Sequence, residues 1–179
     1  LLTRQGRDAE AEALYRDAAT AGLPWAALSL GHLLARQPGR EGEAEQAYRD
    51  ASATGSAATR ALAGLLVEQG ELAPAREYFD QALQIDANVF GPGANPSLAR
   101  DLHGLGRLLR AQGNLVAART TLVRALDVLV SVHGPHHPDV AAVGFAPGGL
   151  LLEQDDLEAA AVAFVRAWQG GDPRLGAEH

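Results

Sequence analysis

The tetrapeptide Tyr-Arg-Asp-Ala occupies residues 15–18 and returns at residues 48–51, 33 residues further along the chain. Three later segments repeat its central feature, a bulky residue followed three positions later by Ala. The bulky residues of the five copies are Tyr15, Tyr48, Phe79, Leu122 and Phe164. A second Ala stands four positions before each of them, so the three residues share one helix face. Five copies of one helical pattern predict an all-α protein built from internal repeats.

A turn signal comes nine or ten residues before most of the bulky residues. It is Gln-Gly at residues 5–6, 69–70 and 112–113, Gln-Asp at 154–155, and an irregular Gly- and Pro-containing stretch at 37–42. Gly at such a position is typical of a helix C-terminus. The signals predict second helices at 8–21, 41–53, 72–86, 115–131 and 156–169, and first helices at 24–36, 56–69, 96–112 and 138–153. Small residues at the crossing let the paired helices approach closely, and neighbouring pairs must stack to bury their apolar faces.

Composition excludes several classes of function. The net charge is -7 with a pI near 5.3, which argues against a general nucleic-acid-binding protein. Cys is absent, which excludes disulfides and thiolate chemistry. No apolar run is long enough for a membrane span and no signal peptide opens the sequence, so we expect a cytoplasmic protein without membrane contact. All 15 basic residues are Arg, a bias that suggests a high-GC bacterial genome.

These motifs resemble the tetratricopeptide repeat, which combines Leu-Gly in the first helix, Gly at the turn, and then Ala, a bulky residue and Ala. Residues 30–31 and 105–106 supply the Leu-Gly element. The resemblance covers a half repeat at 1–22, repeats near 24–55, 56–88, 96–133 and 138–170, and a tail at 171–179. The later copies are similar to the 42-residue variant of kinesin light chains and bacterial sensor proteins, with related loops at 91–99 and 134–141. The resemblance implies a superhelical α-solenoid of about nine helices and no enzymatic activity or cofactor.

Proteins that resemble this family usually bind peptides on the concave surface formed by the first helices. The outward positions carried over from the resemblance are Trp25, His32, Arg60, Arg100, His103, Arg107, Arg110 and Phe145. Arg binds carboxylates with bidentate geometry. We therefore expect a protein or peptide ligand that is acidic or bears a C-terminal carboxylate, with the aromatic residues as apolar contacts. The alternative for these arginines is a solvated basic face that pairs with acidic residues of neighbouring helices.

Other features leave further alternatives. His133, His136, His137 and Asp139 offer metal-binding side chains, but they fall in the inter-repeat loop, so we expect them to cap and pack rather than to bind metal. An apolar end at Leu1 and Leu2 is compatible with self-association. The resemblance also allows a sensor arm of a larger, actinobacterial nucleotide-switch ATPase or regulator. Finally, Gly and Pro at 143–149 predict a kinked or broken first helix, either as a notch in the groove or as a decayed repeat.

Overall fold

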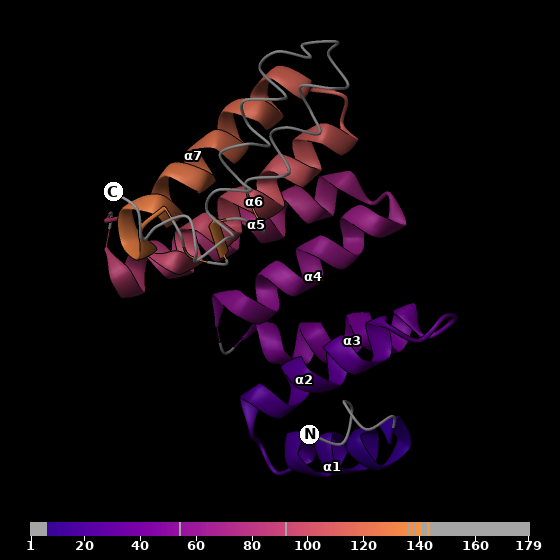
Figure 1. Cartoon of the computed structure of the whole chain (residues 1–179). Helices are drawn as coiled ribbons and strands as arrows, with labels where there is room; N and C mark the ends of the chain where they lie inside the picture. The colour runs from indigo at the N-terminus through magenta and orange to yellow at the C-terminus, as the bar shows by residue number, and fades with distance from the viewer. Residues whose placement is uncertain are drawn as a thin grey trace. The chain divides into compact units, whose positions relative to one another are not determined.

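The computed structural model describes residues 7–53, 55–91, 93–135, 137, 139, 140 and 143. Seven α-helices lie in this part of the chain, and Figure 1 shows their order. They are α1 (Asp8–Thr20), α2 (Pro24–Ala35), α3 (Glu41–Ser52), α4 (Ser56–Gln69), α5 (Leu72–Phe90), α6 (Pro96–Ala111) and α7 (Leu115–His133). The all-α prediction is confirmed, and each predicted helix start in this range is met. The helices expected at 138–153 and 156–169 lie almost wholly outside the described residues.

Local signals explain where the helices begin and end. Asn95 caps α6 by accepting a 2.8 Å hydrogen bond from the backbone N–H of Leu98, and Pro96 fills the first turn. Asn114 caps α7 in the same way through the N–H of Ala117, at 3.2 Å. Gly70 ends α4 with φ 82°, in the left-handed region that disfavours other residues. The Gln-Gly turns at 69–70 and 112–113 are thus helix ends, as predicted.

The chain divides within α5 into two compact units, Leu1–Ile85 and Asp86–His179, and each is described by itself. In the first unit, α1 packs on α2, α2 on α3 and α3 on α4, and α2 also touches α4. In the second unit, α6 packs on α7. Consecutive helices therefore form pairs, as the repeat pattern predicts.

The cores of both units combine small and bulky residues. Ala11, Ala44, Ala75 and Ala118 are each at most 2% exposed, so the small position of the repeat is buried in every described copy. The bulky residues Tyr48, Phe79 and Leu122 are also buried. A Cβ added to Gly31 would lie 2.4 Å from the Tyr48 ring, and one added to Gly106 would lie 2.6 Å from the side chain of Leu122. The Leu-Gly motif thus marks where the two helices of a pair come closest.

Candidate functional site

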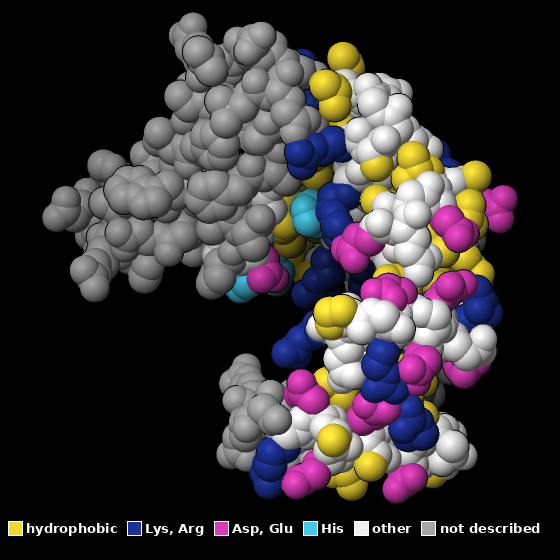
Figure 2. All heavy atoms as spheres, turned by 90° about the vertical axis from the view of Figure 1, so that its right-hand side faces the viewer, with side chains coloured by type: hydrophobic (Ala, Val, Ile, Leu, Met, Phe, Trp, Pro, Cys, Tyr) yellow, Lys and Arg dark blue, Asp and Glu magenta, His cyan; other side chains and the backbone are white. Residues whose placement is uncertain are grey.

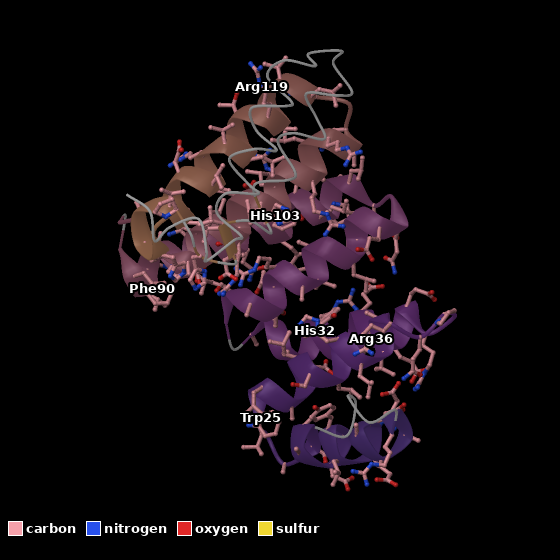
Figure 3. The ribbon with its side chains drawn as sticks, viewed as in Figure 1. Trp25, His32, Arg36, Phe90, His103 and Arg119 are labelled. Atoms are coloured by element: carbon pink, nitrogen blue, oxygen red, sulfur yellow. The ribbon has the colours of Figure 1, made fainter. Side chains whose placement is uncertain are left out.

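In the first unit, the outward face of α2 presents Trp25 and His32, two of the predicted site residues. The Trp25 side chain is 56% exposed, and its ring meets the Tyr15 ring edge-on at a centroid distance of 6.4 Å. Arg36 follows His32 by four residues, so the two share a helix face, and Figure 3 shows them next to each other. No described residue forms an ion pair with Arg36. Arg36 was not predicted from the sequence, although its spacing from His32 was a sufficient signal.

A buried tyrosine orients His32. The Tyr48 hydroxyl lies 2.8 Å from Nδ1 of His32, and the two rings meet at 5.3 Å. Burial, and then the charge of Glu68, raises the pKa of Tyr48 to about 12, so its hydroxyl keeps its proton. Burial lowers the pKa of His32, which favours the neutral ring. When Tyr48 donates to Nδ1, the ring proton of His32 sits on Nε2, where it can donate to a ligand oxygen.

The neighbouring first helix, α4, carries Arg60, Gly64 and Glu68 at intervals of four residues. Arg60, a predicted site residue, is half-buried and has interaction partners of its own. A Cβ added to Gly64 would meet no atom within 4 Å, so the space beside α4 is open there. This face therefore leaves the α4 backbone accessible between its two charged side chains.

In the second unit, the outward face of α6 carries four predicted site residues. Arg100, His103, Arg107 and Arg110 follow one another at intervals of three, four and three. The rest of α6 is buried through Ala99, Leu102 and Gly106 on one side of this row and through Asp101 and Leu108 on the side opposite it.

Two electrostatic interactions act on these α6 side chains. Burial lowers the pKa of His103, and the charge of Arg107 lowers it further. The guanidinium of Arg100 lies 4.0 Å from the Asp139 carboxylate. Figure 2 shows arginine side chains next to a histidine at the level of α6, and Figure 3 labels His103. The structure thus places a cationic face on one helix of an acidic protein.

The acidic residues are concentrated on other helices. The second helices α1, α3 and α5 each carry one Arg and several acidic residues, which are Asp8, Glu10, Glu12 and Asp17 in α1, Glu41, Glu43, Glu45 and Asp50 in α3, and Glu77, Asp80 and Asp86 in α5. Figure 2 shows charges of both signs interspersed over the region that α1 to α3 form. The first helix α2 carries no acidic residue, and the one acidic residue of α6, Asp101, is buried. Acidic side chains are therefore abundant on α1, α3 and α5 and sparse on α2 and α6, whereas the second helix α7 carries Arg119, Arg124 and one acidic residue, Asp127.

An ion-pair network accounts for part of the acidic surface. The Arg40 guanidinium donates to the Glu12 carboxylate at 2.6 and 2.8 Å, and to Glu43 at 2.6 and 2.8 Å. Arg16 also donates to Glu12, at 2.7 Å. Arg40 is the main reason why the pKa of Glu12 is lowered to about 2. The network joins α1 to the start of α3 and is a structural feature rather than a ligand site.

A hollow of about 570 Å³ lies between α1, α2 and α3. Leu23, Ala27, Leu30 and Leu34 line its apolar part, and charged residues such as Asp50 stand at its edge. It exists because α1 and α3 both pack on α2. The hollow was not predicted from the sequence, since its walls come from three helices.

Three further predictions meet different outcomes. Phe145 and the predicted kink at 143–149 lie outside the described residues, apart from Val143, which is helical. Of the histidine cluster, His136 also lies outside the described residues. The structure brings His133, His137 and Asp139 together at the end of α7, with ligand atoms within 4.8 Å of one another.

In the described part of the chain, no helix is both long enough and apolar enough to cross a membrane.

A family comparison identifies the fold. The model of the tetratricopeptide repeat matches residues 54–129 and 97–167, which together span more than half of the chain. The chain belongs to the tetratricopeptide-repeat family. Repeats of this family generally serve as protein–protein interaction scaffolds, as the sequence analysis expected. No curated protein matches the chain.

Solved structures agree with this fold. BtubC (BKLC) from P. vanneervenii is 22% identical and superposes with a TM-score of 0.80, over 99% of this chain and 78% of that one. MamA is 16% identical with a TM-score of 0.64, over 98% and 95% of the two chains. A double mutant of MamA RS-1 is 17% identical with a TM-score of 0.66, over 99% and 92%. At these identities the likeness establishes the fold and not a ligand.

Proposed function

We propose that the chain is a protein-binding module that recognises an acidic segment of its partner through the outward face of α6, without a catalytic step. The observation that carries this proposal is the row formed by Arg100, His103, Arg107 and Arg110. Guanidinium groups bind carboxylates through paired, charge-assisted hydrogen bonds. The exposure of the three arginines supports it too, because Arg100, Arg107 and Arg110 are all exposed and the one acidic residue of α6, Asp101, is buried.

The His32 donor on α2 extends the same chemistry to the first unit. His32 can donate from Nε2, and Arg36 lies one helical turn away. Trp25 adds an exposed aromatic surface on this helix. Each of these groups suits a peptide with acceptor oxygens and apolar side chains. Each unit thus offers a face on which a partner can be bound.

A charge-reversal experiment tests the proposal. Peptides are selected from a degenerate library by the full chain, and binding of the selected peptides is then measured by fluorescence anisotropy from low to physiological salt. We expect Arg107→Glu combined with Arg110→Glu to weaken binding of selected peptides at least about tenfold, as expected for truncated charge pairs at an interface. Binding should also weaken with salt, because exposed charges are screened.

The matched control is Arg119→Glu combined with Arg124→Glu. Both arginines lie on α7 of the same unit, so the two changes together alter the net charge as much as the α6 double variant does but leave the α6 face intact. Equal losses for both variants would show a nonspecific charge effect and reject the α6 site. Selection of neutral peptides by the unmodified chain would reject the acidic ligand.

Self-association is a second candidate, and one observation favours it. Val116, Val123 and Val130 recur every seven residues on α7 and are 67%, 42% and 37% exposed. A row of exposed valines is a surface on which a second copy can pack. Light scattering over a range of protein concentrations tests this alternative, and Val123→Asp should abolish any dimer that uses it. A chain that stays monomeric at all concentrations would reject self-association and leave the binding module as the remaining proposal.

A further inference from the structure

Three side chains with metal-binding atoms converge where α7 ends. His133 is the last residue of α7, and His137 and Asp139 follow in the next segment. One ligand atom of each lies within 4.8 Å of the ligand atoms of the other two. The rings of His133 and His137 are stacked at 4.3 Å with an angle of 18°. Two imidazoles and a carboxylate thus share one solvent-accessible position.

We propose that His133, His137 and Asp139 bind one divalent cation of the zinc class. Two imidazole nitrogens and one carboxylate oxygen are the donors that Zn²⁺ and similar borderline ions prefer, whereas Mg²⁺ prefers oxygen alone. Three protein ligands leave at least one coordination position for water. The proposed metal site is separate from the acidic-peptide site, since none of the α6 arginines is a metal ligand.

The distances are close to those that coordination requires. Tetrahedral Zn²⁺ with bonds of about 2.0–2.1 Å separates its ligand atoms by about 3.3 Å. His137 Nδ1 and Asp139 Oδ2 are 3.9 Å apart, so this pair needs a shift of well under 1 Å. The nitrogen lone pairs lie in the ring planes, and the two planes are stacked and nearly parallel, so His133 must rotate to complete the site. It is exposed at the end of a helix and has room to do so.

The end of α7 favours a cation. The last carbonyl groups of a helix lack intrahelical partners and carry the negative end of the helix dipole. In the described part of the chain, the Gly134 N–H covers one of them by donating to the Val130 carbonyl at 2.9 Å. A positive ion next to His133 therefore lies in a favourable field.

Two existing contacts compete with the ion and limit its affinity. The backbone N–H of Asp139 donates to His137 Nδ1 at 3.2 Å, and coordination through Nδ1 replaces this bond. Arg100 lies 4.0 Å from the Asp139 carboxylate and repels a cation there. We therefore expect affinity in the micromolar range rather than that of a buried structural zinc site. Without the ion, this loop would have the capping and packing role that the sequence predicts.

Isothermal titration of the full chain with zinc chloride, in a buffer that does not bind zinc, tests the site. We expect one equivalent to bind, and magnesium chloride to give no comparable signal. His137→Gln and Asp139→Asn should each weaken zinc binding at least tenfold. His32→Gln and His103→Gln are the matched controls, because these histidines lie elsewhere in the fold, and they should leave the affinity unchanged.

A second measurement needs no substitution, so it decides the question even if a variant folds poorly. Long-range ¹H–¹⁵N spectra of the histidine rings show which nitrogens change on zinc addition. Changes at His133 and His137 support the site. Absence of zinc binding at millimolar metal, an unchanged affinity in His137→Gln, or ring changes confined to other histidines of the chain would each overturn it.

Discussion

The helix pairs α2–α3 and α6–α7 share one packing plan but differ on their outward faces. In each pair a glycine of the first helix faces a bulky residue of the second, Gly31 against Tyr48 and Gly106 against Leu122. The outward face of α2 carries Trp25 and His32, whereas that of α6 carries three arginines and His103. The buried position thus holds an aromatic ring in one pair and an aliphatic side chain in the other. The buried pattern therefore determines the fold, and the outward residues remain available to define a ligand.

The largest expected effect comes from filling the glycine positions. Gly31→Ala and Gly106→Ala place a methyl group 2.4 and 2.6 Å from the facing side chain. Overpacking of this kind lowers the free energy of unfolding by about 1–3 kcal/mol. Gly31→Ala should cost more, because a rigid ring yields less than a leucine side chain. Urea denaturation followed by circular dichroism measures both.

Gly64→Ala is the matched control for these substitutions. It lies inside α4 with nothing within 4 Å of its added Cβ, so Ala should stabilise the chain by up to about 1 kcal/mol through helix propensity. Leu122→Ala makes room next to position 106. The double variant with Gly106→Ala should therefore lose less stability than the sum of the single changes. Additive losses would show that Gly106 and Leu122 do not meet as the structure describes.

The sequence was sufficient to predict these pairs but not the contacts that surround them. Ala and Gly at fixed spacing, with Pro96 and Gly70 as boundary signals, are local features, so helix limits and buried positions followed from them. The hydrogen bond between His32 and Tyr48 depends on side-chain rotamers on two helices. The bond from Arg40 to Glu12 joins residues 28 positions apart. Neither spacing nor composition contains this information, and the hollow between α1, α2 and α3 was missed for the same reason.

Tyr48→Phe tests the feature that distinguishes the first pair from the second. It keeps the ring against Gly31 and removes only the hydroxyl that bonds His32. We expect a loss of about 0.5–1.5 kcal/mol in the free energy of unfolding, toward the lower end because water can reach His32. Urea denaturation at pH 8 measures it. Tyr15→Phe serves as the control, since no described residue hydrogen bonds its hydroxyl, and an equal loss in both variants would refute the role of the His32 bond.

The two pairs should respond alike to pH, through His32 and His103. Burial lowers the pKa of both below the ordinary value of 6.5, so the unfolded chain binds a proton more readily than the folded one. Stability should therefore fall as the pH is lowered through 6.5 and level off below the folded pKa values. His32→Gln and His103→Gln should each reduce the slope between pH 7 and pH 5. An unchanged slope in the double variant would contradict the assignment of this effect to burial of these rings.

The smallest effect concerns the acidic helices. Glu12→Gln removes the charge that Arg40 binds, and at pH 7 we expect a loss of up to about 1 kcal/mol, because the pair is only partly buried. The pKa of Glu12 is lowered from 4.5 to about 2, so its contribution is present above pH 4.5 and is lost as the pH falls toward 2. The stability difference between the variant and the unmodified chain should shrink over that range in urea titrations. Glu10→Gln is the control, because Glu10 and Arg7 are both exposed and 3.5 Å apart, and it should have almost no effect. A Glu12→Gln effect as small as that of Glu10→Gln would mean that the network does not hold α1 to α3, and that the acidic face is solvated surface throughout.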